Sequence, residues 1–110
     1  YDSEYQDSTK HKFPESYLAP IAMVNAAVAA EENGKKPEAI TIYTDLIEGY
    51  RETFPGAAEA LFSLGRLYEQ TGDFASAAEM YEDLEDNFSS TNWTKLARNR
   101  IIKLRIDGKL

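Results

Sequence analysis

The chain has 110 residues and a formal net charge of −7, with one histidine and no cysteine. This length suits a single domain with a modest core. The lack of cysteine excludes disulfides, thiol nucleophiles and cysteine-bound zinc. No run approaches the roughly 18 consecutive apolar residues of a membrane helix, and no period-2 stretch is long enough to predict a strand. We therefore expect an all-α domain.

The first dozen residues, YDSEYQDSTKHK, are polar and leave two interpretations open. One is a polar tail or linker. The other starts from Phe13-Pro14, which resembles Phe54-Pro55 at the end of a later helix. On that alignment residues 1–13 are the remnant of a preceding repeat helix. The chain, which has no initiator methionine, would then be part of a longer array.

Two helices are predicted in residues 14–53. The first begins near Ser16, a good N-cap, and ends before Gly34, which can take the left-handed conformation that stops a helix. The second has a proline in its first turn, and we expect it to continue as far as Phe54. Its buried stripe, at helical spacing, comprises Ile40, Tyr43, Leu46, Ile47 and Tyr50.

Residues 54–90 hold a second pair of helices, joined by Thr71-Gly72-Asp73. Gly72 can end the first helix, and Asp73 can cap the second. Gly65 and Ala77 are small enough to let the two helices approach closely, so we expect the helix contact there. The other buried positions are Leu61, Leu64 and Tyr68 in the first helix and Phe74, Ala78, Tyr81 and Leu84 in the second.

The two helix pairs are related by a shift of about 38 residues, which superposes Gly34 on Gly72. The second pair resembles the tetratricopeptide repeat, whose period is about 34 residues. The first pair departs from that signature at Ala30, where an aromatic residue is usual. The resemblance implies an α-solenoid of two helix-turn-helix repeats, residues 14–53 and 54–90. The positions that carry it are Leu61, Leu64, Gly65, Tyr68, Gly72, Ala77 and Tyr81.

Residues 91–110 predict a closing helix, near Trp93 to Ile106. A repeat cannot bury its own outer face, so arrays usually end in a capping helix that solvates this face. We expect Trp93 to anchor the packing of this helix rather than to contact a ligand. The buried face is expected to comprise Trp93, Leu96, Ala97, Ile101 and Leu104.

Charge is distributed unevenly along the chain. Residues 1–92 hold 18 acidic and 6 basic side chains, whereas residues 93–110 hold 6 basic side chains and 1 acidic one. Six bases at one end of an acidic domain, five of them on one helix, are a weak footprint for nucleic acid, so we expect no nucleic-acid partner. Two interpretations remain: the bases neutralise nearby acids such as Glu82 and Asp86, or the basic end associates with the acidic body of another copy.

Nothing in the sequence predicts catalysis, a metal site or a cofactor. The glycines are isolated turn residues rather than a phosphate-binding loop, and adjacent acids such as Glu31-Glu32 are typical of solvated helix faces. We therefore expect a non-enzyme without catalytic residues.

The resemblance instead implies a protein-interaction module, although a fold alone does not identify the partner. By the resemblance, a partner protein or peptide would lie in a concave groove lined by the first helix of each repeat. The surface suits an apolar or amphipathic peptide with basic flanks. Phe62 and Arg66 are expected to act as binding hot spots, with packing of Phe62 between the repeats as the alternative. The predicted groove residues are Val24, Val28, Glu31, Phe62, Arg66 and Glu69.

Two stretches, FPGAAEALFSLGRLYEQTGDFASAAEMYEDL and SSTNWTKLARNRIIKL, resemble bacterial cell-envelope members of the same family. These members include the Tol-Pal-associated cell-division coordinator and the outer-membrane assembly lipoproteins. The resemblance implies a periplasmic or envelope-associated scaffold that does not insert into the membrane, with a cytoplasmic location as the alternative. The alternative functions are a structural module that forms homo-oligomers and an ancillary interaction domain of a larger protein.

Overall fold

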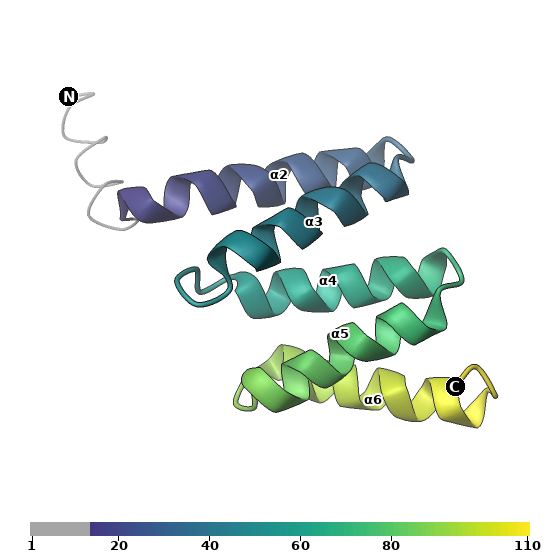
Figure 1. Ribbon diagram of the computed structural model, residues 1–110. Helices are drawn as coiled ribbons and strands as arrows, with labels where there is room; N and C mark the ends of the chain where they lie inside the picture. Colours follow the sequence, from purple (N-terminus) through teal and green to yellow (C-terminus); the bar gives the residue numbers. More distant parts are fainter. Residues whose placement is uncertain (1–13) are drawn as a thin grey trace.

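A computed structural model describes residues 14–110, so both interpretations of residues 1–13 lie outside the described part of the chain. Consecutive helices pack as antiparallel neighbours (Figure 1), and α4 also contacts α6. Residues 14–110 contain no strand, which confirms the predicted all-α class, with two helix pairs and a fifth helix. The elements are a 3₁₀ turn η1 (Glu15–Tyr17), α2 (Leu18–Glu32), α3 (Lys36–Tyr50), α4 (Ala57–Gln70), α5 (Phe74–Asn87) and α6 (Asn92–Ile106).

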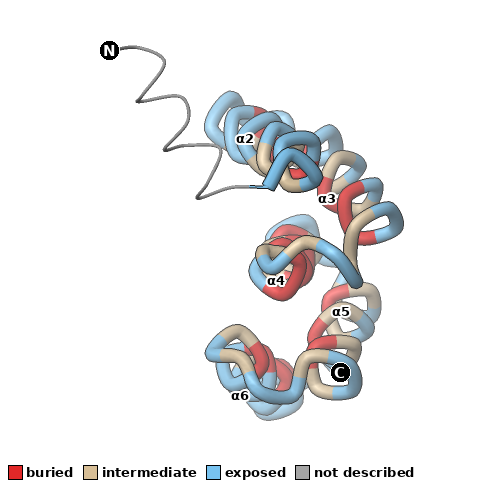
Figure 2. Tube along the Cα trace, turned by 90° about the vertical axis from the view of Figure 1, so that its left-hand side faces the viewer, coloured by how far each residue is buried: buried red, intermediate tan, exposed pale blue. Residues whose placement is uncertain are grey.

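The helices form two rows. Figure 2 shows α2, α4 and α6 along one side of the molecule and α3 and α5 along the other. Buried side chains lie mainly where the two rows meet, and the largest fully buried ones include Leu46, Leu61, Leu67, Tyr81 and Leu84. Because the first helix of each pair lies in the same row, α2 and α4 present neighbouring faces to solvent on one side of the array.

The turns within the two helix pairs have the same geometry, as the repeat predicts. Gly34 and Gly72 have φ angles of +74° and +84°. The next N–H group donates to the carbonyl of Ala30 in one turn, at 2.8 Å, and of Tyr68 in the other, at 2.9 Å. Asp73 then accepts a hydrogen bond from the N–H of Ser76, which confirms its predicted role as the cap of α5.

The alanine that departs from the repeat signature leaves no large gap in the core. Ala30 is only 7% exposed, whereas Tyr68, at the corresponding position, is itself half-buried. With alanine in place of the usual aromatic residue, the first pair therefore lacks a ring at the margin of the core rather than at its centre.

One predicted helix cap and one predicted helix boundary in the first pair are wrong. Ser16 does not cap α2, because the N–H of Tyr17 donates to the carbonyl of Pro14 and residues 15–17 form a tight 3₁₀ turn before the helix begins. Nor does α3 continue to Phe54: it ends at Tyr50, whose carbonyl accepts hydrogen bonds from two later N–H groups. Pro55 disfavours the helical conformation for the residue before it. The extra length of this repeat therefore lies mostly in the connection formed by residues 51–56.

The contact between α4 and α5 depends on Gly65 and the ring of Tyr81. A Cβ added to Gly65 would lie 2.5 Å from Cε1 of Tyr81, which is closer than real Cβ contacts come. Ala77 is fully buried, as expected. Gly65 therefore serves mainly to make room for the aromatic ring of α5.

The buried face of α6 differs from the prediction, because Trp93 is only half-buried, Leu96 is exposed and Thr94 is buried instead. The buried residues are Thr94, Ala97, Ile101 and Leu104, whereas Leu96 is 45% exposed. A position two residues after Thr94 lies about 200° round the helix, which turns Leu96 away from the core. The hydroxyl of Thr94 is satisfied because it bonds the carbonyl of Phe88, at the end of α5. α6 thus buries a hydrogen-bonded threonine, while the leucine that hydrophobicity predicted to be buried faces away from the core.

Candidate functional site

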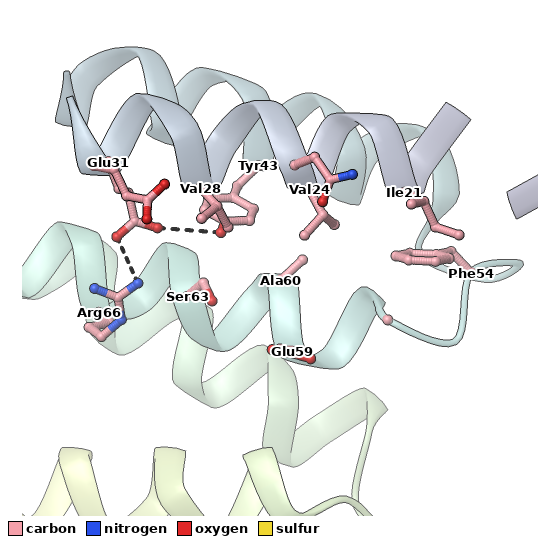
Figure 3. Close-up of a pocket in the computed structure, with 13 residues that line it drawn as sticks. Ile21, Val24, Val28, Glu31, Tyr43, Phe54, Glu59, Ala60, Ser63 and Arg66 are labelled. Atoms are coloured by element: carbon pink, nitrogen blue, oxygen red, sulfur yellow. Dashed lines mark hydrogen bonds and ion pairs between the residues drawn. The ribbon is translucent and has the colours of Figure 1, made fainter. Parts of the chain in front are cut away.

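A groove of about 400 Å³ runs between α2 and α4 (Figure 3). Ile21, Val24 and Val28 form the wall from α2, since they lie on one face of that helix at helical spacing. Ala60 and Ser63 belong to the α4 wall. The groove is therefore mainly apolar along its length, with charged side chains at its margins.

Phe54 lies near one end of the groove, in the connection between α3 and α4 (Figure 3). Its ring meets that of Tyr17 edge to face, with centroids 6.0 Å apart. It also covers Gly56, where an added Cβ would come within 2.6 Å of the ring. The residues that lengthen the first repeat thus form one apolar end of the groove.

The other end of the groove is polar. Glu31 accepts a hydrogen bond from Arg66 Nη2 at 2.9 Å and one from the Tyr43 hydroxyl at 3.4 Å (Figure 3). Burial, together with the negative charge of Glu31, raises the pKa of Tyr43, so the phenol remains a donor. Arg66 therefore points at a carboxylate of the same molecule rather than freely into solvent.

A second hollow, of about 330 Å³, lies next to the groove and includes residues from α4, α5 and α6. Glu69 accepts two hydrogen bonds from Arg100, at 3.0 and 2.5 Å, and one from the Tyr81 hydroxyl at 2.5 Å. Burial acts to raise the pKa of Glu69, but the hydrogen bonds from Arg100 and Tyr81 outweigh it and the pKa is lowered. Glu69 is thus held as a carboxylate.

These two clusters are repeats of one arrangement. In each, a glutamate near the end of a first helix accepts from a tyrosine 12 residues later, in the second helix of the same pair. An arginine from the next helix in the row of α2, α4 and α6 then pairs with that glutamate. The clusters are Glu31–Tyr43–Arg66 and Glu69–Tyr81–Arg100. Each cluster links two neighbouring helices of this row, so the clusters help to set the spacing of α2, α4 and α6.

Phe62 packs among helices instead of lining the groove between α2 and α4. It is half-buried, and its ring centroid lies 5.6 Å from those of both Tyr81 and Trp93. It lines the second hollow together with Glu69, and Arg66 lines both the hollow and the groove. The structure thus brings Val24, Val28, Glu31 and Arg66 together in the groove and places Phe62 and Glu69 beside it.

Sequence reasoning missed several groove residues. Ile21 lies one turn before Val24, and Glu59 and Ser63 share a face of α4 with Arg66, so helical spacing could have found all three. Phe54 could not be found in this way, because its place depends on how residues 51–56 fold.

The margins of the groove carry unneutralised negative charge. Glu32 and Glu59 both line it, and within residues 14–110 neither takes part in an ion pair.

In the same part of the chain, no set of acidic and histidine side chains is arranged to hold a metal ion. None of the helices described is both long and apolar enough to cross a membrane. The groove thus combines apolar walls with carboxylates at its margins that have no ion-pair partner in residues 14–110.

Comparisons with known proteins agree with this architecture. A family model described as the tetratricopeptide repeat matches residues 24–90. A "TPR repeat-containing protein" of Treponema pallidum (strain Nichols) is 33% identical over 93 residues, which are 84% of this chain and 38% of that protein. The chain thus spans well under half the length of this relative. No solved structure matches this chain. On the match to its two helix pairs, the chain belongs to the tetratricopeptide repeat family.

Proposed function

We propose that this domain is a protein-interaction scaffold that holds a segment of a partner protein in the groove between α2 and α4. Tetratricopeptide repeats generally mediate protein–protein interaction and are generally non-catalytic, and we propose that this domain likewise acts by binding. The observation that carries the proposal is the groove itself, with apolar walls, one apolar end at Phe54 and one polar end at Glu31 and Arg66.

The charges at the margins indicate the chemistry of the partner. Val24 and Val28 offer apolar surface to aliphatic or aromatic anchor side chains, while Glu32 and Glu59 favour lysine or arginine beside those anchors. A segment with apolar anchors and basic flanks matches both features. A segment with acidic flanks would place like charges together and bind more weakly.

Two short synthetic peptides test this proposal. Both carry the same leucine and isoleucine anchors, flanked by lysine in one and by glutamate in the other. Fluorescence anisotropy should show the lysine-flanked peptide binding more tightly. Val28→Glu, at a position already 41% exposed, should weaken its binding about tenfold or more, which is about 1.4 kcal/mol.

Ala26→Glu is the matched control for Val28→Glu. It adds the same charge to the same helix at an exposed position that does not line the groove, so binding should change little. If Val28→Glu binds the lysine-flanked peptide as tightly as the parent chain does, the groove is not the binding site.

We further propose that the domain works within a bacterial cell-envelope assembly, in the periplasm or at the envelope. Support comes from the resemblance of residues 54–84 and 89–104 to envelope members of the family. Fractionation of cells that express the full protein tests the location. Recovery with the envelope or periplasmic fraction is expected, and recovery only with the cytosol would contradict the proposal.

A further inference from the structure

The last helix of the described residues, α6, exposes large aliphatic side chains. Leu96, Ile102 and Ile106 are 45%, 49% and 75% exposed. Ile102 and Ile106 lie one turn apart and form a short apolar strip on α6, whereas Leu96, six residues before Ile102, lies about 120° round the helix from it. Exposed strips of this kind often mark binding surfaces.

Basic side chains surround this strip. Lys95, Arg98, Lys103 and Arg105 belong to the same helix, and all four are exposed. Their partners within residues 14–110 neutralise them only in part: Arg98 lies 3.9 Å from Glu85, and Lys103 pairs with the nearby Asp107. The outer side of α6 is thus apolar with basic flanks.

The groove between α2 and α4 has the complementary character. Its walls are apolar, and Glu32 and Glu59 at its margins have no ion-pair partner in residues 14–110. The α6 of the same molecule cannot reach it, because α6 packs on α5 at the opposite end of the array from α2 (Figure 2). A second copy has no such restriction.

We propose that α6 of one copy docks in the α2–α4 groove of a second copy. This inference rests on the proposed function, since it names the occupant of that same groove. Ile102 and Ile106 would contact the valines of α2, and the bases of α6 would lie near Glu32 and Glu59. The two surfaces are different patches, so the interface is heterologous, and copies add head to tail until they form a ring or an open chain.

Light scattering over a range of protein concentrations tests the association of the parent chain. The mass should rise above the 12.4 kDa of one chain as concentration increases. It should fall when salt is raised from roughly 0.05 to 0.5 M, because added salt screens attraction between exposed charges. A mass that stays at one chain under all these conditions overturns the inference.

Two variants, each blocked on one surface, test the geometry. Val28→Glu blocks the groove and Ile102→Glu blocks the strip on α6, so each variant alone should remain monomeric. A mixture still contains one intact strip and one intact groove, and should therefore form a complex of two chains and nothing larger. Ala26→Glu should associate like the parent. Val28 and Ile102 are both exposed, and circular dichroism with thermal melting verifies that each variant is folded.

The mixture also identifies the surfaces. If the parent associates but the two variants do not assemble when mixed, or if Val28→Glu associates as the parent does, the proposed pairing is wrong. The lysine-flanked peptide separates this inference from the proposed function. If the parent is always monomeric and yet binds the peptide in a manner sensitive to Val28→Glu, only the second-copy inference fails. If the peptide does not bind either, both fail.

Discussion

The rings of Phe62 and Trp93 lie with their centroids 5.6 Å apart and their planes inclined by 40°, so an aromatic contact joins α4 to α6. The ring of Tyr81, on α5, lies equally far from that of Phe62. Phe62 is thus in contact with an aromatic ring on each of the two helices that follow its own. This arrangement agrees with the expectation that Trp93 anchors the closing helix, and it makes Phe62 part of the packing.

Phe62→Ala should lower the free energy of unfolding by about 2–4 kcal/mol. Truncation of a buried phenylalanine typically costs about 3–5 kcal/mol, and this ring is half-buried. Urea denaturation measures the loss. An unchanged midpoint would show that the ring is dispensable for packing. It would favour the other interpretation, in which Phe62 is a binding hot spot. Its role in partner binding remains a prediction, which must be measured on variants that are still folded.

Gly65→Ala should destabilise the chain by about 1–3 kcal/mol, the usual effect of overpacking. The new methyl group would lie 2.5 Å from Cε1 of Tyr81, so the ring or the helix must shift. Gly49→Ala is the matched control, because a Cβ at that helical position meets nothing within 4 Å. It should stabilise the helix by up to about 1 kcal/mol. Thermal melting compares the two, and equal shifts would contradict the assigned contact.

The features that could be predicted from the sequence depend on local chemistry. Left-handed glycines at residues 34 and 72 and the capping Asp73 follow from short-range preferences. The faces of α4 and α5 follow from helical spacing. These local features locate the helices and most of their inward sides, and hence the fold class.

The features that could not be predicted depend on partners distant in sequence. Arg66 has the right spacing for a groove residue, but its pairing with Glu31, 35 residues earlier, is a result of how the repeats stack. Thr94 is buried with its hydroxyl bonded to the carbonyl of Phe88, a contact that hydrophobicity does not report. Phe54 reaches the groove only because residues 51–56 turn back. Such details require the tertiary structure.

Acidic pH should destabilise the chain through Glu69 and Asp83. Burial opposes ionisation of both, but hydrogen bonds from Arg100 and Tyr81 lower the pKa of Glu69 below 4.5, and those from Arg51 and Asn87 lower the pKa of Asp83 below 3.8. Because both values are lower in the folded state, this stabilisation is present above the ordinary pKa values. It is lost as the pH falls through the lowered ones.

Urea denaturation at a series of pH values from about 7 to about 3 measures this loss. Glu69→Gln removes one of the responsible carboxylates, so its stability should depend less steeply on pH than that of the parent. Glu59→Gln changes an exposed carboxylate without an ion pair in residues 14–110. It should retain more of the pH dependence than Glu69→Gln, and the opposite order would contradict the assignment.

Arg66→Ala should separate binding from stability. The Arg66 side chain is 38% exposed and its contact with Glu31 is a single hydrogen-bonded ion pair, so its loss should cost less than about 1 kcal/mol of stability. Binding should respond more strongly, because Arg66 lines the groove and holds Glu31 in place. We expect the lysine-flanked peptide to bind more weakly by more than about 1 kcal/mol.

Arg98→Ala provides the matched control for Arg66→Ala. It removes the same type of side chain, whose contact with Glu85 is a long one at 3.9 Å and which does not line the groove. At protein concentrations too low for self-association, peptide binding should match that of the parent. If Arg66→Ala and Arg98→Ala change binding equally, the effect does not depend on a position in the groove. In that case Arg66 has no specific place in the groove, and the polar end of the site must be assigned to other residues.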